Sequence, residues 1–282
     1  MTQTPATAAV VQPDGEITLT VDGQIAIINI AREKKLNSFT IPMVEELESH
    51  LAVIDDSEDV RVVIVTSAGD RAFSAGADIE AFSRLSATRM WSTWIRRGHA
   101  LFDKLAGLRQ PSIAAIDGNA FGGGLELALA CDIRVMAADA KVGLSELGIG
   151  TLPGWGGTDR LQRTVGVARA KRMIFTSLMV DAPTALDWGL VTDVTERSEV
   201  VAKAREIADQ IATRAPIALQ MSKQIIDGQS GQGLRLTLEA LGSAASSATD
   251  DFVEGVSAFR NKRHPEFTGS FDDPASRAAL HE

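Results

Sequence analysis

The sequence predicts an α/β fold in which strands and helices alternate, followed by a region made of helices alone. Three observations carry this prediction. Short apolar runs of strand length recur along the chain, each followed by a segment with helical spacing. After residue 195 the alternation stops, and only helical periods continue toward the C-terminus. No low-complexity linker and no obvious repeat divides the chain.

The expected strands share short alternating or continuous apolar runs that are rich in β-branched residues. They are residues 16–23, 24–31, 61–67, 112–118, 132–137 and 141–146. The first two alternate apolar and polar side chains on either side of Asp22-Gly23, a dipeptide typical of tight turns, and therefore predict a β-hairpin. The others predict buried strands of the core.

The expected helices place apolar side chains three to four residues apart. In the core they are residues 40–57, with Pro42 at an early position that helices tolerate, residues 87–108, and a segment that follows three glycines. Trp91 and Trp94 are expected to be packing residues. The helices predicted beyond the core are residues 199–214, 216–228, 234–248 and 250–263.

The chain organisation that follows has three parts. Residues 1–14 lack both a basic leader and a long apolar run, and are expected to form a disordered tail. Residues 15–196 are expected to form the α/β core that holds the active site. Residues 197–282 are expected to form a helical region suited to contact between copies of the chain.

Composition excludes several classes of function. The net charge of −9 disfavours nucleic acid or an anionic membrane as the main partner, and no run reaches the roughly 18 apolar residues of a membrane span. Cys131 is the only cysteine, which suits a cytoplasmic location, and its apolar setting indicates a buried small side chain. The four histidines have no metal-ligand spacing, so no metal is expected.

Three segments combine glycine with charge: "FSAGADI", "FGGGLEL" and "LSELGIGTLPGWGGTDRL". Each links a predicted strand to a predicted helix, where backbone N–H groups have no helical partner and favour negative charge. Two such groups from separate loops would form an oxyanion hole. The glycines could also serve tight turns only. Phosphate binding is a weaker alternative, because neither nucleotide-binding glycine motif is complete.

Two acids stand beside these glycines. Glu126 follows the triplet at the start of a helix, and Glu146 ends a predicted strand just before another glycine-rich turn. Paired carboxylates near free N–H groups suit general acid–base chemistry, and burial together with mutual proximity would separate their pKa values. Alternatively, either acid alone could be a turn carboxylate satisfied by backbone N–H groups.

A serine-hydrolase hypothesis rests on "AFSAG", which is similar to a nucleophile elbow with Ser74 as nucleophile. His264 lies in the chain order that such a triad requires, but its "KRHPEF" setting is typical of a solvated helix end. This alternative is the weaker one.

The ordered motifs "AFSAGADI", "GNAFGGGLELALACDI", "LSELGIGTLPGWGGTDRL", "DWGLVTDV" and "DDFVEGVSAFRNKR" resemble the enoyl-CoA hydratase/isomerase (crotonase) superfamily over residues 16–265. The resemblance implies a crotonase-type spiral of ββα turns whose helical C-terminal region builds trimers, often paired into hexamers. It implies an acyl-CoA thioester substrate, with coenzyme A as part of the substrate and no separate cofactor.

By motif position, the resemblance implies an oxyanion hole made by the N–H groups of Ala77 and Gly123. It assigns both family glutamates, to Glu126 and Glu146, which favours hydration of a 2-enoyl-CoA. Glu126 is expected to deprotonate water and Glu146 to deliver the α-proton. A double-bond isomerase that uses Glu146 and a non-catalytic binder of acyl-CoA remain alternatives.

The resemblance also implies a set of substrate-binding residues, which are Lys34, Ala75, Asp78, Ile79, Gly122 and Trp155. Lys34 aligns with a basic residue near the coenzyme A moiety. Trp155 stands where many members of the superfamily have a small residue, and is expected to narrow or reshape the acyl pocket.

Overall fold

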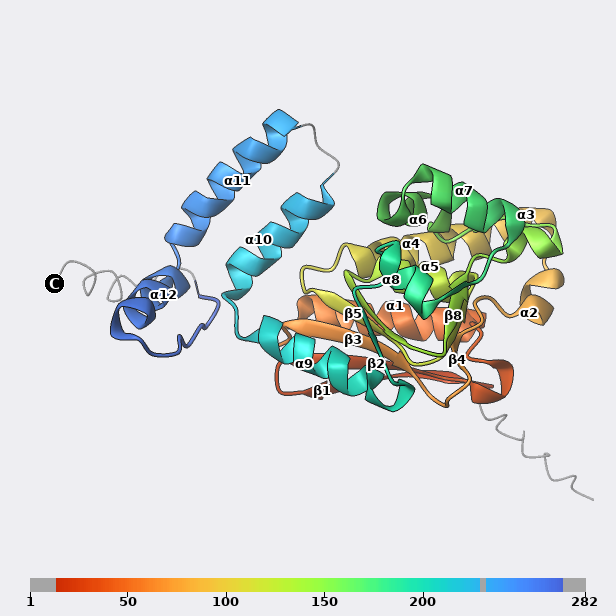
Figure 1. Cartoon of the computed structure of the whole chain (residues 1–282), viewed down its shortest axis with the longest axis horizontal. Coiled ribbons are helices and arrows are strands. Elements are labelled where there is room, and N and C mark those ends of the chain that lie inside the picture. The colour runs from red at the N-terminus through yellow and green to blue at the C-terminus, as the bar shows by residue number, and fades with distance from the viewer. Residues whose placement is uncertain (1–13, 229–231, 271–282) are drawn as a thin grey trace, which may run out of the picture.

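The computed structural model describes residues 14–228 and 232–270, which include most of the predicted core (Figure 1). Its main sheet has six strands in the order β1-β2-β3-β5-β7-β10. These strands are β1 Glu16–Asp22, β2 Ile25–Ala31, β3 Val62–Ser67, β5 Ser112–Ile116, β7 Ile133–Ala137 and β10 Asp193–Thr195. All neighbours pair in parallel except β1 and β2. The predicted α/β class is confirmed.

The N-terminal hairpin forms at the predicted turn. Strands β1 and β2 pair antiparallel, with Ile17 opposite Ile30 and Asp22 opposite Ile25. Gly23 takes φ +60°, a left-handed conformation that glycine adopts without steric cost. Every residue of β3 is buried, as expected for a strand covered on both faces.

A second, four-stranded sheet was not predicted. Its order is β4-β6-β8-β9, and its strands are β4 Ala72–Ser74, β6 Asn119–Phe121, β8 Lys141–Gly143 and β9 Val180–Asp181. The chain passes from β3 to β4, from β5 to β6 and from β7 to β8 before each return through helices. This repetition of two strands and a helical segment is the predicted spiral. The expected strand over residues 141–146 ends at Gly143.

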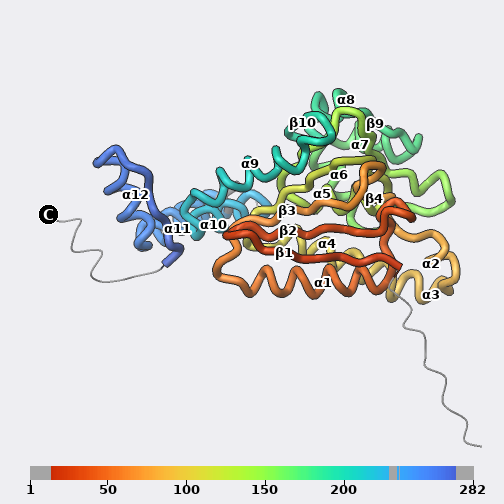
Figure 2. The backbone as a smooth tube through the Cα atoms, turned by 90° about the horizontal axis from the view of Figure 1, so that it is seen from below, coloured from red at the N-terminus to blue at the C-terminus, as the bar shows by residue number. Residues whose placement is uncertain are grey.

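Helices cover both faces of the main sheet (Figure 2). Helix α1 (Ile41–Asp56) lies on one face and contacts β1, while α9 (Val200–Ala212) lies on the other and contacts β3 and β5. Five apolar residues of α1 are buried at helical spacing, as predicted, namely Met43, Val44, Leu47, Leu51 and Ile54.

The prediction of one regular helix over residues 87–108 is wrong, because the segment is helical but irregular. The segment consists of α3 (Ala87–Arg89), a π-helical turn (Met90–Ile95) and α4 (Arg96–Ala106). Trp94 is buried as expected, whereas Trp91 is 65% exposed, so its predicted packing role is wrong. A π-helical turn widens the helix locally, and such turns often occur beside functional sites.

The C-terminal region is helical, as predicted. Helix α9 belongs to the core, because Val200, Ala204 and Ala208 are fully buried. The part that stands apart from the sheets is made of α10 (Pro216–Asp227), α11 (Gln232–Ser247) and α12 (Asp250–Asn261) (Figure 1). The expected tail lies outside the described residues except for Asp14, which forms an ion pair with Arg32.

The loop after β4 packs directly against the first turn of α5 (Gly123–Ala130). A Cβ atom on Gly124 would overlap the carbonyl oxygen of Ser74, and a Cβ on Gly76 would lie only 2.6 Å from the nitrogen of Gly123. Gly76 also has φ +86°, where a side chain is strained. Glycine is therefore required on both sides of this contact, which joins two of the motifs found in the sequence.

We predict that Gly124→Ala lowers the free energy of unfolding by about 3 kcal/mol or more, because its methyl group would force backbone apart. The control is Gly148→Ala, whose Cβ would meet only Ser177 Oγ, at 3.7 Å. Its change should stay within about 1 kcal/mol. Urea unfolding followed by circular dichroism measures both variants, and equal stability of the two would contradict the tight contact.

Candidate active site

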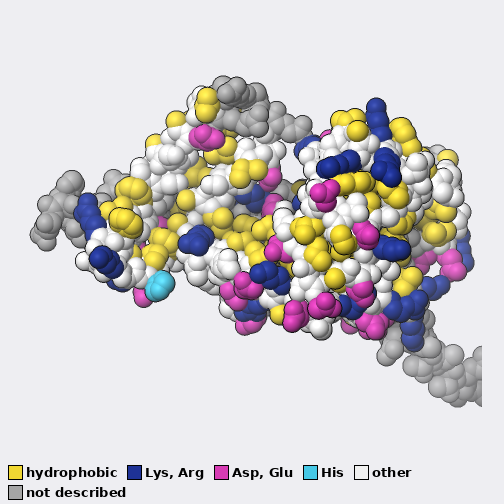
Figure 3. Space-filling model, in the orientation of Figure 1, with side chains coloured by type: hydrophobic (Ala, Val, Ile, Leu, Met, Phe, Trp, Pro, Cys, Tyr) yellow, Lys and Arg dark blue, Asp and Glu magenta, His cyan; other side chains and the backbone are white. Residues whose placement is uncertain are grey.

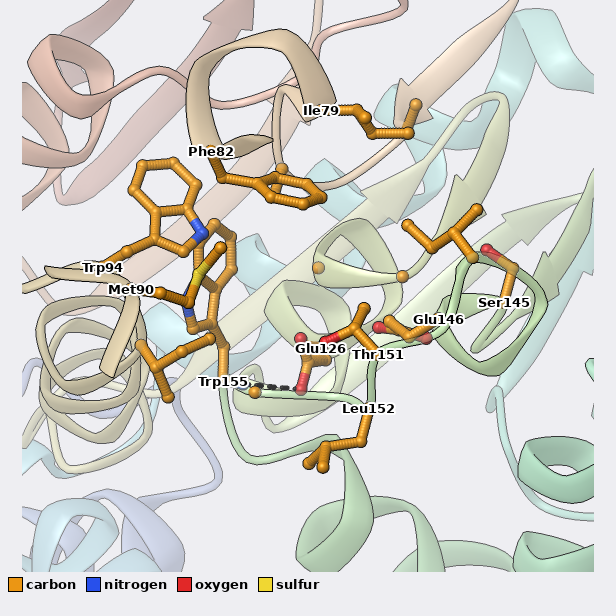
Figure 4. Close-up of a pocket in the computed structure, with 17 residues that line it drawn as sticks. Ile79, Phe82, Met90, Trp94, Glu126, Ser145, Glu146, Thr151, Leu152 and Trp155 are labelled. Atoms are coloured by element: carbon orange, nitrogen blue, oxygen red, sulfur yellow. Dashed lines mark hydrogen bonds between the residues drawn. The ribbon is translucent and has the colours of Figure 1, made fainter. Parts of the chain in front are cut away.

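A cavity opens between the loop after β4, the start of α5 and the glycine-rich segment after β8 (Figure 4). Its walls are of three kinds. Ala77 and Gly123 line part of it. The carboxylates of Glu126 and Glu146 reach into it, and apolar side chains close the remainder. The cavity brings together all four residues predicted to carry the chemistry.

The N–H groups of Ala77 and Gly123 are both available in the cavity. Phe39 donates its N–H to Gly76 O at 2.7 Å and accepts the N–H of Asp78 at 3.0 Å, so this pairing leaves the Ala77 N–H unused. Gly123 is the first residue of α5, where N–H groups lack helical partners. Within residues 14–228 and 232–270, neither N–H is bonded to a backbone or side-chain acceptor. Two free donors thus lie on opposite sides of the Gly76–Gly123 contact.

Glu126 is held by two backbone N–H groups. Trp155 N and Gly157 N each donate to its Oε1 at 2.8 Å, and the residue is 2% exposed. A Cβ on Gly157 would lie 2.9 Å from Glu126 Cγ, so only glycine lets the donor approach this closely. Burial raises the pKa of Glu126, although the N–H groups of Gly157 and Trp155 oppose the rise. The alternative, in which backbone N–H groups satisfy a turn carboxylate, therefore holds for only one of the two oxygens of Glu126, Oε1.

Glu146 has the opposite environment. It begins the 3-10 segment Glu146–Ile149, and both of its carboxylate oxygens are buried without a hydrogen-bond partner among the described residues. Burial, and secondarily the charge of Glu126, raises the pKa of Glu146 to about 7. The alternative of a turn carboxylate satisfied by backbone N–H groups is wrong for this residue.

The two carboxylates differ in how strongly each one holds a proton. Donated N–H bonds from two other residues stabilise the ionised form of Glu126, whereas no other residue donates to Glu146, and only its own backbone N–H opposes the rise in its pKa. These environments favour the negative charge on Glu126 and the proton on Glu146. Because the sites interact, the proton belongs to the pair, and its distribution follows the difference between the two environments.

The other predicted binding residues fall into two groups. The cavity is lined by Ala75, Ile79, Gly122 and Trp155, as their predicted role requires. A Cβ on Gly122, which has φ +52°, would lie 3.3 Å from Glu146 Oε1. The binding roles of these residues stay predictions.

Asp78 and Lys34 do not line the cavity. The Asp78 carboxylate caps α2 (Ile79–Ser83) by accepting the Ala81 N–H and pairs with Arg32 at 2.6 Å. Burial alone would raise the pKa of Asp78, but the hydrogen bonds from Arg32 and Ala81 lower it below its usual value. Asp78 therefore supports the loop that carries Ala77. Lys34 is exposed on the 3-10 segment Glu33–Lys35.

The sequence did not identify most of the apolar wall. The additional lining residues are Phe82, Met90, Trp94, Ile95, Ile149 and Leu152. Three of them, Met90, Trp94 and Ile95, come from the π-helical turn before α4, whose apolar residues fit an ordinary helix and so do not indicate the wider turn. The buried Arg32 was also missed, although an arginine directly after an apolar strand could have indicated an ion pair.

Ser74 and Cys131 take no part in the cavity. Ser74 is fully buried, its hydroxyl donates to Asn37 O at 2.8 Å and accepts the Gly76 N–H at 3.0 Å. His264 is exposed beyond α12. The serine-hydrolase hypothesis therefore finds no accessible nucleophile. Burial raises the pKa of the Cys131 thiol to about 12, consistent with the predicted packing role.

In the described part of the chain, every helix is too short or too polar to span a membrane. Within the same residues, histidine, cysteine and acidic side chains form no group of three or more that could hold a metal ion.

Comparison with known proteins places this site in a family. The model of the enoyl-CoA hydratase/isomerase family matches residues 20–270. The short-chain-enoyl-CoA hydratase of Clostridium acetobutylicum is 37% identical over 252 residues, which cover 89% of this chain and 96% of that protein. The crotonyl-CoA hydratase of Syntrophomonas wolfei is 34% identical over 89% of this chain and 97% of its own length.

Solved structures of members of this family have the same fold. A crystal structure of an enoyl-CoA hydratase from Bacillus anthracis superposes with a TM-score of 0.88 at 36% identity, covering 90% of this chain and 99% of that one. The chain belongs to the enoyl-CoA hydratase/isomerase family. The resemblance inferred from the sequence motifs is confirmed.

The raised pKa of Glu146 predicts a cost in stability. A carboxyl whose pKa rises from 4.5 to about 7 on folding contributes fully to stability below pH 4.5 and loses that contribution as pH rises through 7. We expect Glu146→Gln to stabilise the protein by about 2–3 kcal/mol at pH 8 relative to the wild type, and by far less at pH 4.

Urea unfolding at the two pH values measures this difference. The control is Glu58→Gln, since Glu58 is exposed outside the cavity and should change stability little at either pH. An equal effect of Glu146→Gln at pH 4 and pH 8 would contradict a buried, partnerless Glu146.

Proposed function

We propose that the protein is an enoyl-CoA hydratase that adds water reversibly across the 2,3 double bond of a 2-enoyl-CoA to give a 3-hydroxyacyl-CoA. The observation that carries this proposal is the asymmetric pair of buried carboxylates in the same cavity as two residues with free backbone N–H groups. Relatives named as enoyl-CoA and crotonyl-CoA hydratases support it.

The N–H groups of Ala77 and Gly123 bind the thioester oxygen in this proposal. Addition of water to C3 moves negative charge onto that oxygen, giving an enolate. Fixed donors in a cavity from which water is largely excluded stabilise such charge more than water does, by about 3 kcal/mol per donor. Coenzyme A is part of the substrate, and we infer that no other cofactor takes part.

The carboxylates supply the two proton transfers. The ionised Glu126 takes one proton from water as the water oxygen bonds to C3, and the protonated Glu146 gives its proton to C2 as the enolate collapses. One hydrogen and one hydroxyl are thereby added, and the proton now on Glu126 must return to Glu146. The different environments of the two carboxylates support this assignment of the base and the acid.

The remaining predicted residues fit supporting roles. We infer that Ala75, Ile79, Gly122 and Trp155 contact the acyl-thioester end of the substrate, and that the exposed Lys34 lies near the phosphates of coenzyme A. Asp78 acts by holding the Ala77 loop through Arg32. A cytoplasmic location, which fits the free thiol of Cys131, stays a prediction.

We also propose that α10–α12 build a trimer, which can pair into a hexamer. These helices expose many large apolar side chains, visible as yellow patches over their side of the molecule (Figure 3). The residues are Ile226, Leu234, Leu236, Leu238, Leu241, Phe252 and Phe259. An exposed apolar surface of this extent is typical of contacts between subunits.

We predict that the purified protein consumes crotonyl-CoA, seen as loss of enoyl-thioester absorbance, and that Glu126→Gln and Glu146→Gln each lower kcat by about 100-fold or more. The matched control is Glu48→Gln, because Glu48 lies on α1 and pairs with Arg97 on the surface. Failure to hydrate any of a broad panel of 2-enoyl-CoAs would refute the hydratase. Conversion of 3-enoyl-CoA to 2-enoyl-CoA without hydration would instead indicate the isomerase, and binding alone a non-catalytic acyl-CoA binder.

The trimer has its own test. We expect light scattering after gel filtration to give three times the 30.0 kDa chain mass, or six times for the hexamer. Leu241→Glu combined with Phe259→Glu should give a folded species of lower mass, because buried charges disfavour an apolar contact. A wild-type protein that elutes as a monomer would contradict the proposal.

A further inference from the structure

We propose that the indole of Trp155 is a fixed end wall of the acyl cavity and restricts the enzyme to short 2-enoyl groups. The proposal rests on the proposed hydratase activity. It concerns one side chain, which lines the same cavity as the two glutamates (Figure 4) and also belongs to a cluster of aromatic side chains.

The position of the indole is defined by two glycines. A Cβ on Gly123 would lie 2.8 Å from both Cε3 and Cζ3 of the ring, so the indole lies against the residue whose N–H binds the thioester oxygen. A Cβ on Gly98, in α4, would overlap Nε1 at the other end of the ring. The side chain fills the space between α5 and α4, and an acyl group held at Gly123 meets it within the first few carbons.

The ring has little freedom to move aside. Its centroid is 5.2 Å from that of Phe102, 5.2 Å from that of Trp94 and 6.0 Å from that of Phe39. Two of these contacts are edge-to-face, a favourable aromatic geometry, and Trp155 is only 3% exposed. Rotation of the indole away from the cavity would break this cluster.

The backbone of Trp155 is fixed as well. Its N–H donates to Glu126 at 2.8 Å, and its carbonyl accepts from Arg160 Nη1 at 2.9 Å. The next residue, Gly156, has φ +102°, a conformation that glycine adopts without strain. A shift of the main chain that made room for a longer acyl group would therefore displace the catalytic base.

The space that remains is small and apolar. Phe82, Met90 and Trp94 complete the wall on the side of the indole, and Ile95 also lines the cavity. The cavity volume is about 100 Å³. We infer that this space holds a substituent of one or two carbons beyond the double bond and that the fixed indole stops a longer alkyl chain.

The test measures kcat/KM for trans-2-enoyl-CoAs of four, eight and twelve carbons with the wild type, Trp155→Ala and Trp91→Ala. We expect the wild type to prefer the four-carbon substrate over the twelve-carbon one by 100-fold or more, and Trp155→Ala to reduce this ratio at least tenfold. Trp91→Ala is the matched control, because Trp91 is exposed outside the cavity and its loss should leave the ratio unchanged.

Equal use of the four- and twelve-carbon substrates by the wild type would overturn the proposal. So would a Trp155→Ala variant that slows all chain lengths by the same factor. Circular dichroism checks folding, and Trp155→Leu, which keeps a buried apolar side chain, replaces the alanine variant if that variant does not fold.

Dissociation constants for butyryl-CoA and dodecanoyl-CoA, measured by calorimetry, separate this proposal from the hydratase assignment. Tighter binding of butyryl-CoA by the wild type, with the preference reduced in Trp155→Ala, supports the wall even if no enoyl-CoA is hydrated. Hydration of all chain lengths with equal efficiency confirms the hydratase and refutes the wall.

Discussion

The site depends on one close backbone contact, that between the loop after β4 and the first turn of α5. Gly76 and Gly124 allow it, because a side chain at either position would collide with the backbone of the opposite segment. The contact places the N–H groups of Ala77 and Gly123 beside each other although they lie 46 residues apart in the chain. It also fixes the axis of α5, and with it the direction of Glu126. The loop follows the strands β3 and β4, and α5 follows the strands β5 and β6. The two segments therefore begin at neighbouring strands of the four-stranded sheet, β4 and β6.

Glu126 and Glu146 lie in one cavity, but they differ in the hydrogen bonds that they accept. Both are buried, which raises the pKa of each, but only Glu126 receives backbone N–H bonds. The glycine-rich segment after β8 supplies those bonds and also carries Glu146, so one loop contributes to the environments of both carboxylates. A buried carboxylate without a partner lowers stability, and sites that hold such groups are typically functional. Trp155 connects this arrangement to the substrate, because its backbone holds the base while its ring limits the acyl group.

Much of this was predictable from the sequence. The hairpin, the buried strands and the C-terminal helices follow from periodicity and turn chemistry. Glu126 and Glu146 follow from the glycine-rich segments beside them, whereas Ala77 and Gly123 follow only from the resemblance to the superfamily. The strands β4 and β6 did not, because three residues are too few to show a period. The π-helical turn was missed for a related reason, since its apolar residues fit an ordinary helix. The cap formed by Asp78 and its pairing with Arg32 join segments 46 residues apart, and no local pattern indicates such contacts. The same holds for the aromatic cluster around Trp155, which only packing reveals.

The central claim is that Ala77 and Gly123 bind the thioester oxygen with their backbone N–H groups. A crystal structure with acetoacetyl-CoA, a thioester that has no 2,3 double bond to hydrate, tests it most directly. We expect the thioester oxygen to lie about 2.7–3.1 Å from both nitrogens, with C2 and C3 facing Glu146 and Glu126. A thioester oxygen bound by a side chain, or within hydrogen-bond distance of only one of the two nitrogens, would contradict the account.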